Sequence, residues 1–121
     1  MTPLDLLQNF YQRSNVIVQA GAPAWVTILH DSFRPSHEVW GEFFSRCVNC
    51  ALDTHIYQAW AWTRDPDWFY DHSCADGARV KELIATGISV IVGEWSLATG
   101  ANNISTLCTL LMFLILSRFY R

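Results

Sequence analysis

The chain has 121 residues and a formal net charge of -3, with hydrophobic residues at 51% and charged residues at 16%. This length holds one domain with a sizeable core, and the apolar content excludes a disordered chain. No basic run is present, so we expect no nucleic-acid partner, because binding to phosphates needs a positive surface. The first residues show no basic leader followed by a small-residue cleavage site, so no secretory signal peptide is expected.

Helical and extended patterns alternate along the chain. A proline near the start favours a first helix, and a glycine at position 87 is typical of the end of the third. The expected elements are a helix over 2–21, a strand over 25–29, a helix over 35–44, a strand over 50–57, a loop over 60–72, a helix over 74–85 and a strand over 88–96. This alternation predicts an α/β fold with a parallel sheet and right-handed crossovers.

The last expected strand ends near a carboxylate, Glu94. Its run of Val and Ile is typical of a parallel strand that is buried on both faces. An unpaired charge is costly inside such a strand, so we expect Glu94 to emerge where the strand ends. In barrels of alternating strands and helices the carboxyl ends of the strands carry the active site. Glu94 is therefore the first candidate for catalysis.

The other two expected strands also carry polar residues at their carboxyl ends. His30 and Asp31 end the first strand, and His55 and Tyr57 end the second. Side chains alternate along a strand, so Asp53 should share one face with this second pair. Because parallel strands end at a common edge, the three polar ends together predict a functional site there.

Three ordered segments resemble the later strands of glycoside hydrolase family 5, in particular its exo-β-1,3-glucanases. They are Leu-His-Asp-Ser-Phe at 29–33, Ala-Leu-Asp-Thr-His-Ile-Tyr-Gln at 51–58 and Val-Gly-Glu-Trp-Ser at 92–96. The resemblance implies a partial TIM barrel, (β/α)8, with strands five to seven in a domain over 1–105. It also implies a glucan 1,3-β-glucosidase of the extracellular space or cell wall, which hydrolyses β-1,3-glucan by a retaining mechanism without a cofactor.

The same resemblance assigns roles to individual residues. It implies that Glu94 is the nucleophile, that Tyr57 hydrogen-bonds this nucleophile and that His55 helps form the sugar-binding floor. Trp60 would flank the substrate entrance. Aromatic faces also suit the apolar faces of sugar rings. The remaining candidates for substrate binding are Trp95, Asp31 and His30.

The sequence departs from the family in two respects. The family's general acid lies in an Asn-Glu-Pro motif, and this sequence contains none, so we expect the chain alone to be nearly inactive. Residues 106–121 form an apolar tail instead of the expected eighth-strand region. Its apolar run over 107–116 is shorter than the ~20 residues that span a bilayer, so no membrane partner is expected. A truncated or misassembled gene would produce such a tail, as would an apolar helix that docks on the barrel.

Other interpretations of these residues remain open. The chain could be a noncatalytic carbohydrate-binding remnant, or Glu94 could be a structural, ion-paired carboxylate. Asp31 could cap the turn that follows it. A metal-dependent hydrolase is a further alternative, although we expect no metal; its ligands would be His30, Asp31, Asp53 and His55.

Two further expectations concern the cysteines and the sheet edges. Cys47 and Cys50 lack a second pair at zinc-site spacing, so we expect either two buried thiols or one local disulfide. Three strands of a closed barrel leave two open edges, which favours self-association.

Overall fold

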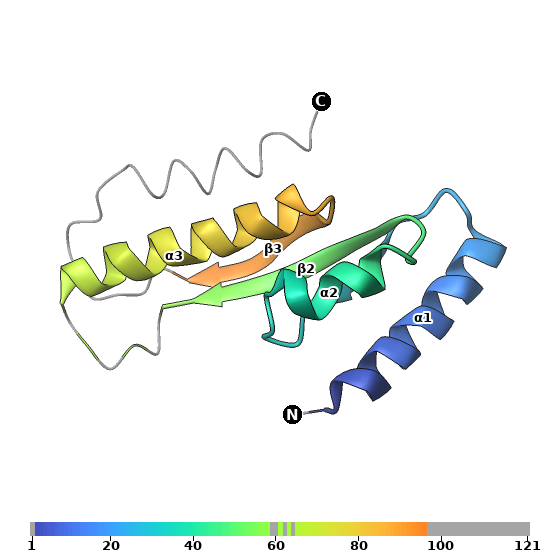
Figure 1. The fold of residues 1–121 in the computed structure, drawn as a ribbon, viewed down its shortest axis with the longest axis horizontal. Coiled ribbons are helices and arrows are strands. Elements are labelled where there is room, and N and C mark those ends of the chain that lie inside the picture. The colour runs from blue at the N-terminus through green and yellow to red at the C-terminus, as the bar shows by residue number, and fades with distance from the viewer. Residues whose placement is uncertain (1, 59–60, 62, 64, 97–121) are drawn as a thin grey trace.

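A computed structural model describes residues 2–58, 61, 63 and 65–96, which form a parallel three-stranded sheet with helices between the strands (Figure 1). Both strand pairs are parallel, and β2 lies at the centre of the order β1-β2-β3. The elements are α1 (Leu4–Gly21), β1 (Thr27–His30), α2 (His37–Phe44), β2 (Cys50–Tyr57), α3 (Pro66–Ala85) and β3 (Ser89–Ser96). The expected α/β alternation with a parallel sheet is therefore confirmed.

The hydrophobic core lies between the sheet and the helices, on one face of the strands. We call this the covered face and its reverse the open face. The buried members of the core are Leu29, Trp40, Phe43, Leu52, Val80, Leu83, Ile88 and Val90. Side chains on the open face are more exposed, as Ile28 shows with 57% of its surface accessible. Because strand residues alternate between faces, the choice of face decides which side chains can form a site.

The expectation that β3 is buried on both faces is wrong for the described residues. Val90 is buried, but Ile91 and Val92 are only partly buried and Ser89 is exposed. The side chain of Glu94 is 61% exposed, in agreement with the expectation that this residue emerges from the strand. The cause is that the helices cover only one face of the sheet. A run of Val and Ile favours an extended strand, but it does not say whether a second layer covers it.

α3 begins at Pro66, so the expected loop over 60–72 is wrong for residues 66–72. The side chain of Asp65 accepts a hydrogen bond from the backbone N–H of Asp67 at 3.0 Å and so caps the helix. Pro66 occupies the first turn, where its missing N–H costs nothing. Near this end of the helix Trp68 stacks on His72, one turn further along, with ring centroids 4.5 Å apart. The polar and aromatic composition of this segment predicted a loop, although the segment contains a normal helix start.

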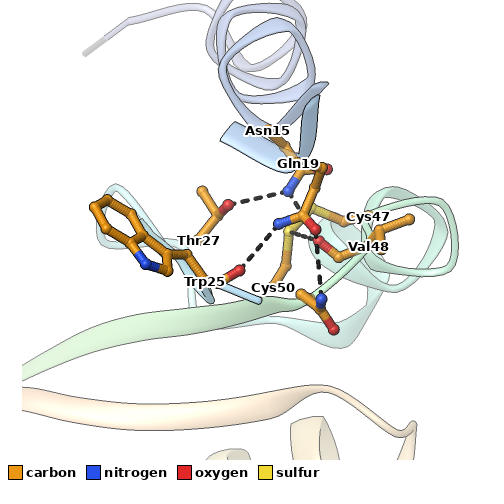
Figure 2. The surroundings of a disulfide bond; sticks show 8 residues. Asn15, Gln19, Trp25, Thr27, Cys47, Val48 and Cys50 are labelled. Atoms are coloured by element: carbon orange, nitrogen blue, oxygen red, sulfur yellow. Dashed lines mark hydrogen bonds between the residues drawn. A yellow bond between two sulfur atoms is a disulfide. The ribbon is translucent and has the colours of Figure 1, made fainter. Parts of the chain in front are cut away.

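A polar network fixes the amino ends of β1 and β2, as Figure 2 shows. The buried side chain of Asn15 on α1 donates to Thr27 Oγ1 at 3.0 Å and to the Val48 carbonyl at 2.9 Å. Beside it, Cys47 and Cys50 form a disulfide in the turn that enters β2. The structure therefore selects the local disulfide from the two alternatives for this pair.

No helix among the described residues is long and apolar enough to cross a membrane. The tail over 106–121, the end of the domain expected over 1–105, and Trp60 lie outside the described residues.

Candidate functional site

A β-bulge in β3 brings Glu94 onto the same face as His55. Up to this point the register is regular, with Thr54 opposite Val92, but the next pair joins His55 to Glu94 and leaves Gly93 as an extra residue. Val92 packs against the core, so a regular strand would return to the covered face at position 94. The bulge reverses this alternation, and the carboxylate turns to the open face.

The absence of a side chain at Gly93 lets the carboxylate of Asp53 lie against the bulge. The Gly93 N–H donates to Asp53 Oδ1 at 3.0 Å. A Cβ added at Gly93 would lie 2.9 Å from Asp53 Cγ and closer still to Oδ1, well inside van der Waals contact. A side chain at this position would therefore displace the Asp53 carboxylate from the bulge.

Four side chains from β2 and β3 form a continuous hydrogen-bonded group, which we call the β2–β3 cluster: Asp53, His55, Tyr57 and Glu94. His55 Nε2 lies 3.2 Å from Asp53 Oδ2, and His55 Nδ1 lies 3.0 Å from the Tyr57 hydroxyl. The Tyr57 hydroxyl donates a short hydrogen bond to Glu94 Oε2, which also lies 3.4 Å from His55 Nδ1. The structure therefore brings together the three residues expected at the catalytic centre.

The cluster changes the acidity of Tyr57. Its hydrogen bond to Glu94 stabilises the neutral phenol and, with smaller contributions from desolvation and from the negative charges of Glu94 and Asp53, raises the pKa of Tyr57 to about 12. The phenol therefore keeps its proton to a higher pH than an ordinary tyrosine does. In this form it is a donor to the Glu94 carboxylate.

His30 and Phe33 extend the site from β1. The His30 ring meets the His55 ring edge-on at a centroid distance of 4.5 Å, and His30 Nδ1 accepts from the Ser32 N–H at 2.9 Å. The Phe33 ring lies 5.2 Å from His30 and remains 59% exposed. The structure thus places the expected residue His30 at the cluster. It also adds Phe33, which the sequence analysis missed.

The turn that presents Phe33 is strained. Ser32 and Phe33 have φ values of 55° and 59°, in the left-handed region that costs a residue other than glycine about 1–3 kcal/mol. Hydrogen bonds compensate, because Asp31 Oδ1 accepts from the Phe33 N–H at 2.8 Å. Nothing in the local sequence signals two such residues in succession, so the position of this ring could be found only from the backbone.

Neither Asp31 nor Trp95 shares the open face of the sheet with Glu94, so the structure does not bring these two expected residues into the β2–β3 cluster. Asp31 is fully buried, and its Oδ2 accepts from Thr54 Oγ1 at 2.6 Å on the covered face. It caps the turn, as the alternative interpretation held. Trp95 pairs with Ile56 and therefore lies on the face opposite Glu94, with 46% of its surface exposed.

The residues considered as metal ligands contact one another in two separate pairs. Asp31 Oδ1 lies 3.8 Å from His30 Nε2, and Asp53 Oδ2 lies 3.2 Å from His55 Nε2. Within the described part of the chain, no group of three or more His, Cys, Asp or Glu residues is arranged to hold a metal ion.

A cavity of about 390 Å³ lies next to the cluster, between the end of β2 and α3. Phe33 and Tyr57 line one side, and His72, Asp76 and Arg79 line the other. Asp76 is 3% exposed and forms an ion pair with Arg79 within α3. Glu94 is not part of this lining, and 61% of its side chain is exposed.

Comparison with known proteins gives no family for the chain: no family model matches it, and neither a curated protein nor a solved structure matches it significantly.

Proposed function

We propose that the chain forms part of a retaining β-1,3-glucan hydrolase of the glycoside hydrolase family 5 type, with Glu94 as the nucleophile. The observation that carries this proposal is the hydrogen bond from Tyr57 to an accessible Glu94 carboxylate, with His55 beside both. In this proposal the sheet corresponds to strands five to seven of a TIM barrel, whose active site lies at the carboxyl ends of the strands.

Retaining hydrolysis needs a carboxylate nucleophile and a carboxylic acid that protonates the leaving oxygen, about 5 to 5.5 Å apart. Glu94 is accessible to a sugar, and the Tyr57 donor orients it. Asp53 is a poor candidate for the acid, because both of its oxygens already accept hydrogen bonds from Gly93 and His55. The sequence contains no Asn-Glu-Pro motif to supply the acid. The described residues therefore support the nucleophilic half of the reaction.

Two other features support the same proposal. The exposed ring of Phe33 beside the cluster offers an apolar surface to the carbon face of a sugar, which favours β-glucan as the partner. The Cys47–Cys50 disulfide is typical of an oxidising compartment and is consistent with an extracellular or cell-wall location.

The nucleophile can be tested without the general acid by using 2-deoxy-2-fluoro-β-glucosyl fluoride. A Glu94 oxygen attacks the anomeric carbon, the C–F bond breaks, and fluoride leaves with the bonding pair without needing a proton. We expect intact-mass spectrometry to show one fluoroglucosyl group on the full chain and none on Glu94→Gln. Tyr57→Phe should label more slowly, by about tenfold or more, because the donor that orients the carboxylate is lost.

The matched control is Glu82→Gln, which removes an exposed carboxylate on α3 and should label like the unchanged chain. An unlabelled wild-type chain, or labelling of Glu94→Gln at the wild-type rate, would contradict the proposed nucleophile.

The exposed Phe33 ring also favours a second candidate, a noncatalytic carbohydrate-binding protein. This candidate predicts that β-1,3-gluco-oligosaccharides bind the chain, that binding is lost in Phe33→Ala, and that no covalent label forms. Isothermal titration calorimetry combined with the labelling experiment separates the two functions.

A further inference from the structure

Asp53 has no part in the proposed nucleophilic attack, yet it makes a defined contact with each of its oxygens. Oδ1 accepts from the Gly93 N–H at 3.0 Å, and Oδ2 lies 3.2 Å from His55 Nε2. The side chains of Asp53 and His55 are each only 21% exposed, so water competes weakly for this contact. An ionised carboxylate can only accept hydrogen bonds. The proton in this contact must therefore be on His55 Nε2.

We propose that Asp53 is a positioning residue that fixes His55 in the tautomer with a proton on Nε2, so that Nδ1 is the nitrogen that faces Tyr57 and Glu94. A hydrogen bond to one ring nitrogen of a histidine determines which nitrogen is left for chemistry. The importance of this tautomer for hydrolysis rests on the proposed function, but the tautomer itself does not.

The tautomer determines the partner of the single Tyr57 hydroxyl proton. When Nδ1 carries no proton, it competes with Glu94 for the hydroxyl proton of Tyr57, because the hydroxyl contacts both groups. When Nδ1 gains a proton, it donates to the phenol oxygen, and Tyr57 donates to Glu94 alone. The protonation of His55 thus controls the hydrogen bond that the nucleophile receives.

The groups around His55 come from all three strands. Asp53 and Tyr57 lie on β2, Glu94 lies on β3, and the His30 ring from β1 meets it edge-on. The His30 ring has its own partners, because its Nδ1 accepts from the Ser32 N–H at 2.9 Å and its Nε2 lies 3.8 Å from Asp31 Oδ1.

Asp53 also links the ring to the bulge. The carboxylate that holds His55 accepts from the extra residue of the bulge, Gly93, which immediately precedes Glu94. The Asp53 side chain therefore fixes the orientation of the His55 ring and also supports the backbone that turns Glu94 to the open face. This double contact explains why a carboxylate lies on the open face two residues before the histidine.

The test is long-range ¹H–¹⁵N NMR of the full chain with ¹⁵N-labelled histidine, at a mildly alkaline pH where an ordinary imidazole is neutral. In the wild-type chain we expect His55 to carry its proton on Nε2, with slower exchange with water than at the exposed His37. In Asp53→Asn the amide NH₂ donates to Nε2, so the proton should move to Nδ1. The matched control, Asp71→Asn on the surface of α3, should leave the His55 signals unchanged.

A wild-type His55 with its proton on Nδ1, or an Asp53→Asn variant that keeps the proton on Nε2, would overturn the inference. If Asp53→Asn does not fold, Gly93→Ala provides a second test, because its methyl group displaces the Asp53 carboxylate without removing it. There we expect His55 to lose its slow exchange, and retention of slow exchange would also overturn the inference. The expected tautomer without covalent labelling would refute only the proposed hydrolase, and labelling with the other tautomer would refute only the role of Asp53.

Discussion

The contact between Tyr57 and Glu94 couples the chemistry of two residues that are 37 positions apart in the sequence. Strand residues of one face meet across a sheet only when their registers agree, and here the bulge at Gly93 produces that agreement. The carboxylate gains a donor, and the phenol is held in its neutral form. At the residue scale, the site therefore depends on one backbone irregularity.

Replacing Glu94 by Gln should lower the pKa of Tyr57 from about 12 towards the ordinary value of 10, because the charge that favours the neutral phenol is removed. The measurement is a tyrosinate absorbance titration, with the Tyr57→Phe curve subtracted to isolate this residue. Tyr11 serves as an internal reference, since its pKa is raised mainly by burial and then by Asp31. An unchanged Tyr57 titration in Glu94→Gln would contradict the coupling.

The sign of the stability effect follows from the same pKa. Between pH 10 and about 12 the unfolded chain releases the Tyr57 proton while the folded chain keeps it, so the free energy of unfolding falls as the pH rises. Below pH 10 the contribution is fully present. Glu94→Gln should reduce the fall across this interval, as urea unfolding at a series of pH values can show.

Among the elements, α3 shows that a capping residue can decide where a helix begins even when the composition of the segment favours a loop. Its first turn contains Trp, Asp and Pro, which favour a loop by composition, yet Asp65 and Pro66 give a normal helix start. The first two turns carry the stacked pair Trp68 and His72, whose i, i+4 spacing brings the rings together only in a helix.

Asp65→Ala should lower the free energy of unfolding by about 0.5–2 kcal/mol, because the Asp67 N–H loses its acceptor. Urea unfolding measures the loss, and amide hydrogen exchange should show faster opening confined to the first turn of α3. The matched control is Asp71→Ala in the same helix, which removes an exposed carboxylate but no cap. Equal destabilisation by the two substitutions would show that Asp65 does not act as the cap.

At the scale of the whole molecule, the described part of the chain leaves large apolar side chains exposed both on the sheet and on α1. β1 is hydrogen-bonded to a described strand on one side only, and it carries Ile28 with 57% of its surface exposed. Phe10 and Ile17 on α1 are 63% and 73% exposed. An exposed apolar edge strand is a template for pairing with another chain.

We therefore expect self-association and poor solubility of the isolated chain, increasing with protein concentration. Ile28→Lys should shift the population towards the monomer, because a charge on an edge strand opposes pairing with a second chain. Light scattering coupled to size-exclusion chromatography measures this change. Ile84→Lys is the control, since Ile84 is an exposed apolar residue on α3 rather than on a strand. A monomer at every concentration that unfolds cooperatively would contradict this expectation.

The sequence by itself determined the alternation of helices and strands and the grouping of His30, His55, Tyr57 and Glu94 at one edge of the sheet. These features follow from local periodicity and from the rule that parallel strands end together. Only the tertiary structure decided which polar residues face one another. Asp31 is buried by its contact with Thr54, Trp95 lies on the covered face after the bulge, and Phe33 is presented by a left-handed turn. The physical reason is that burial and strand register depend on contacts between distant segments, which no local pattern in the sequence contains, and that no residue type at positions 32 and 33 requires a positive φ angle.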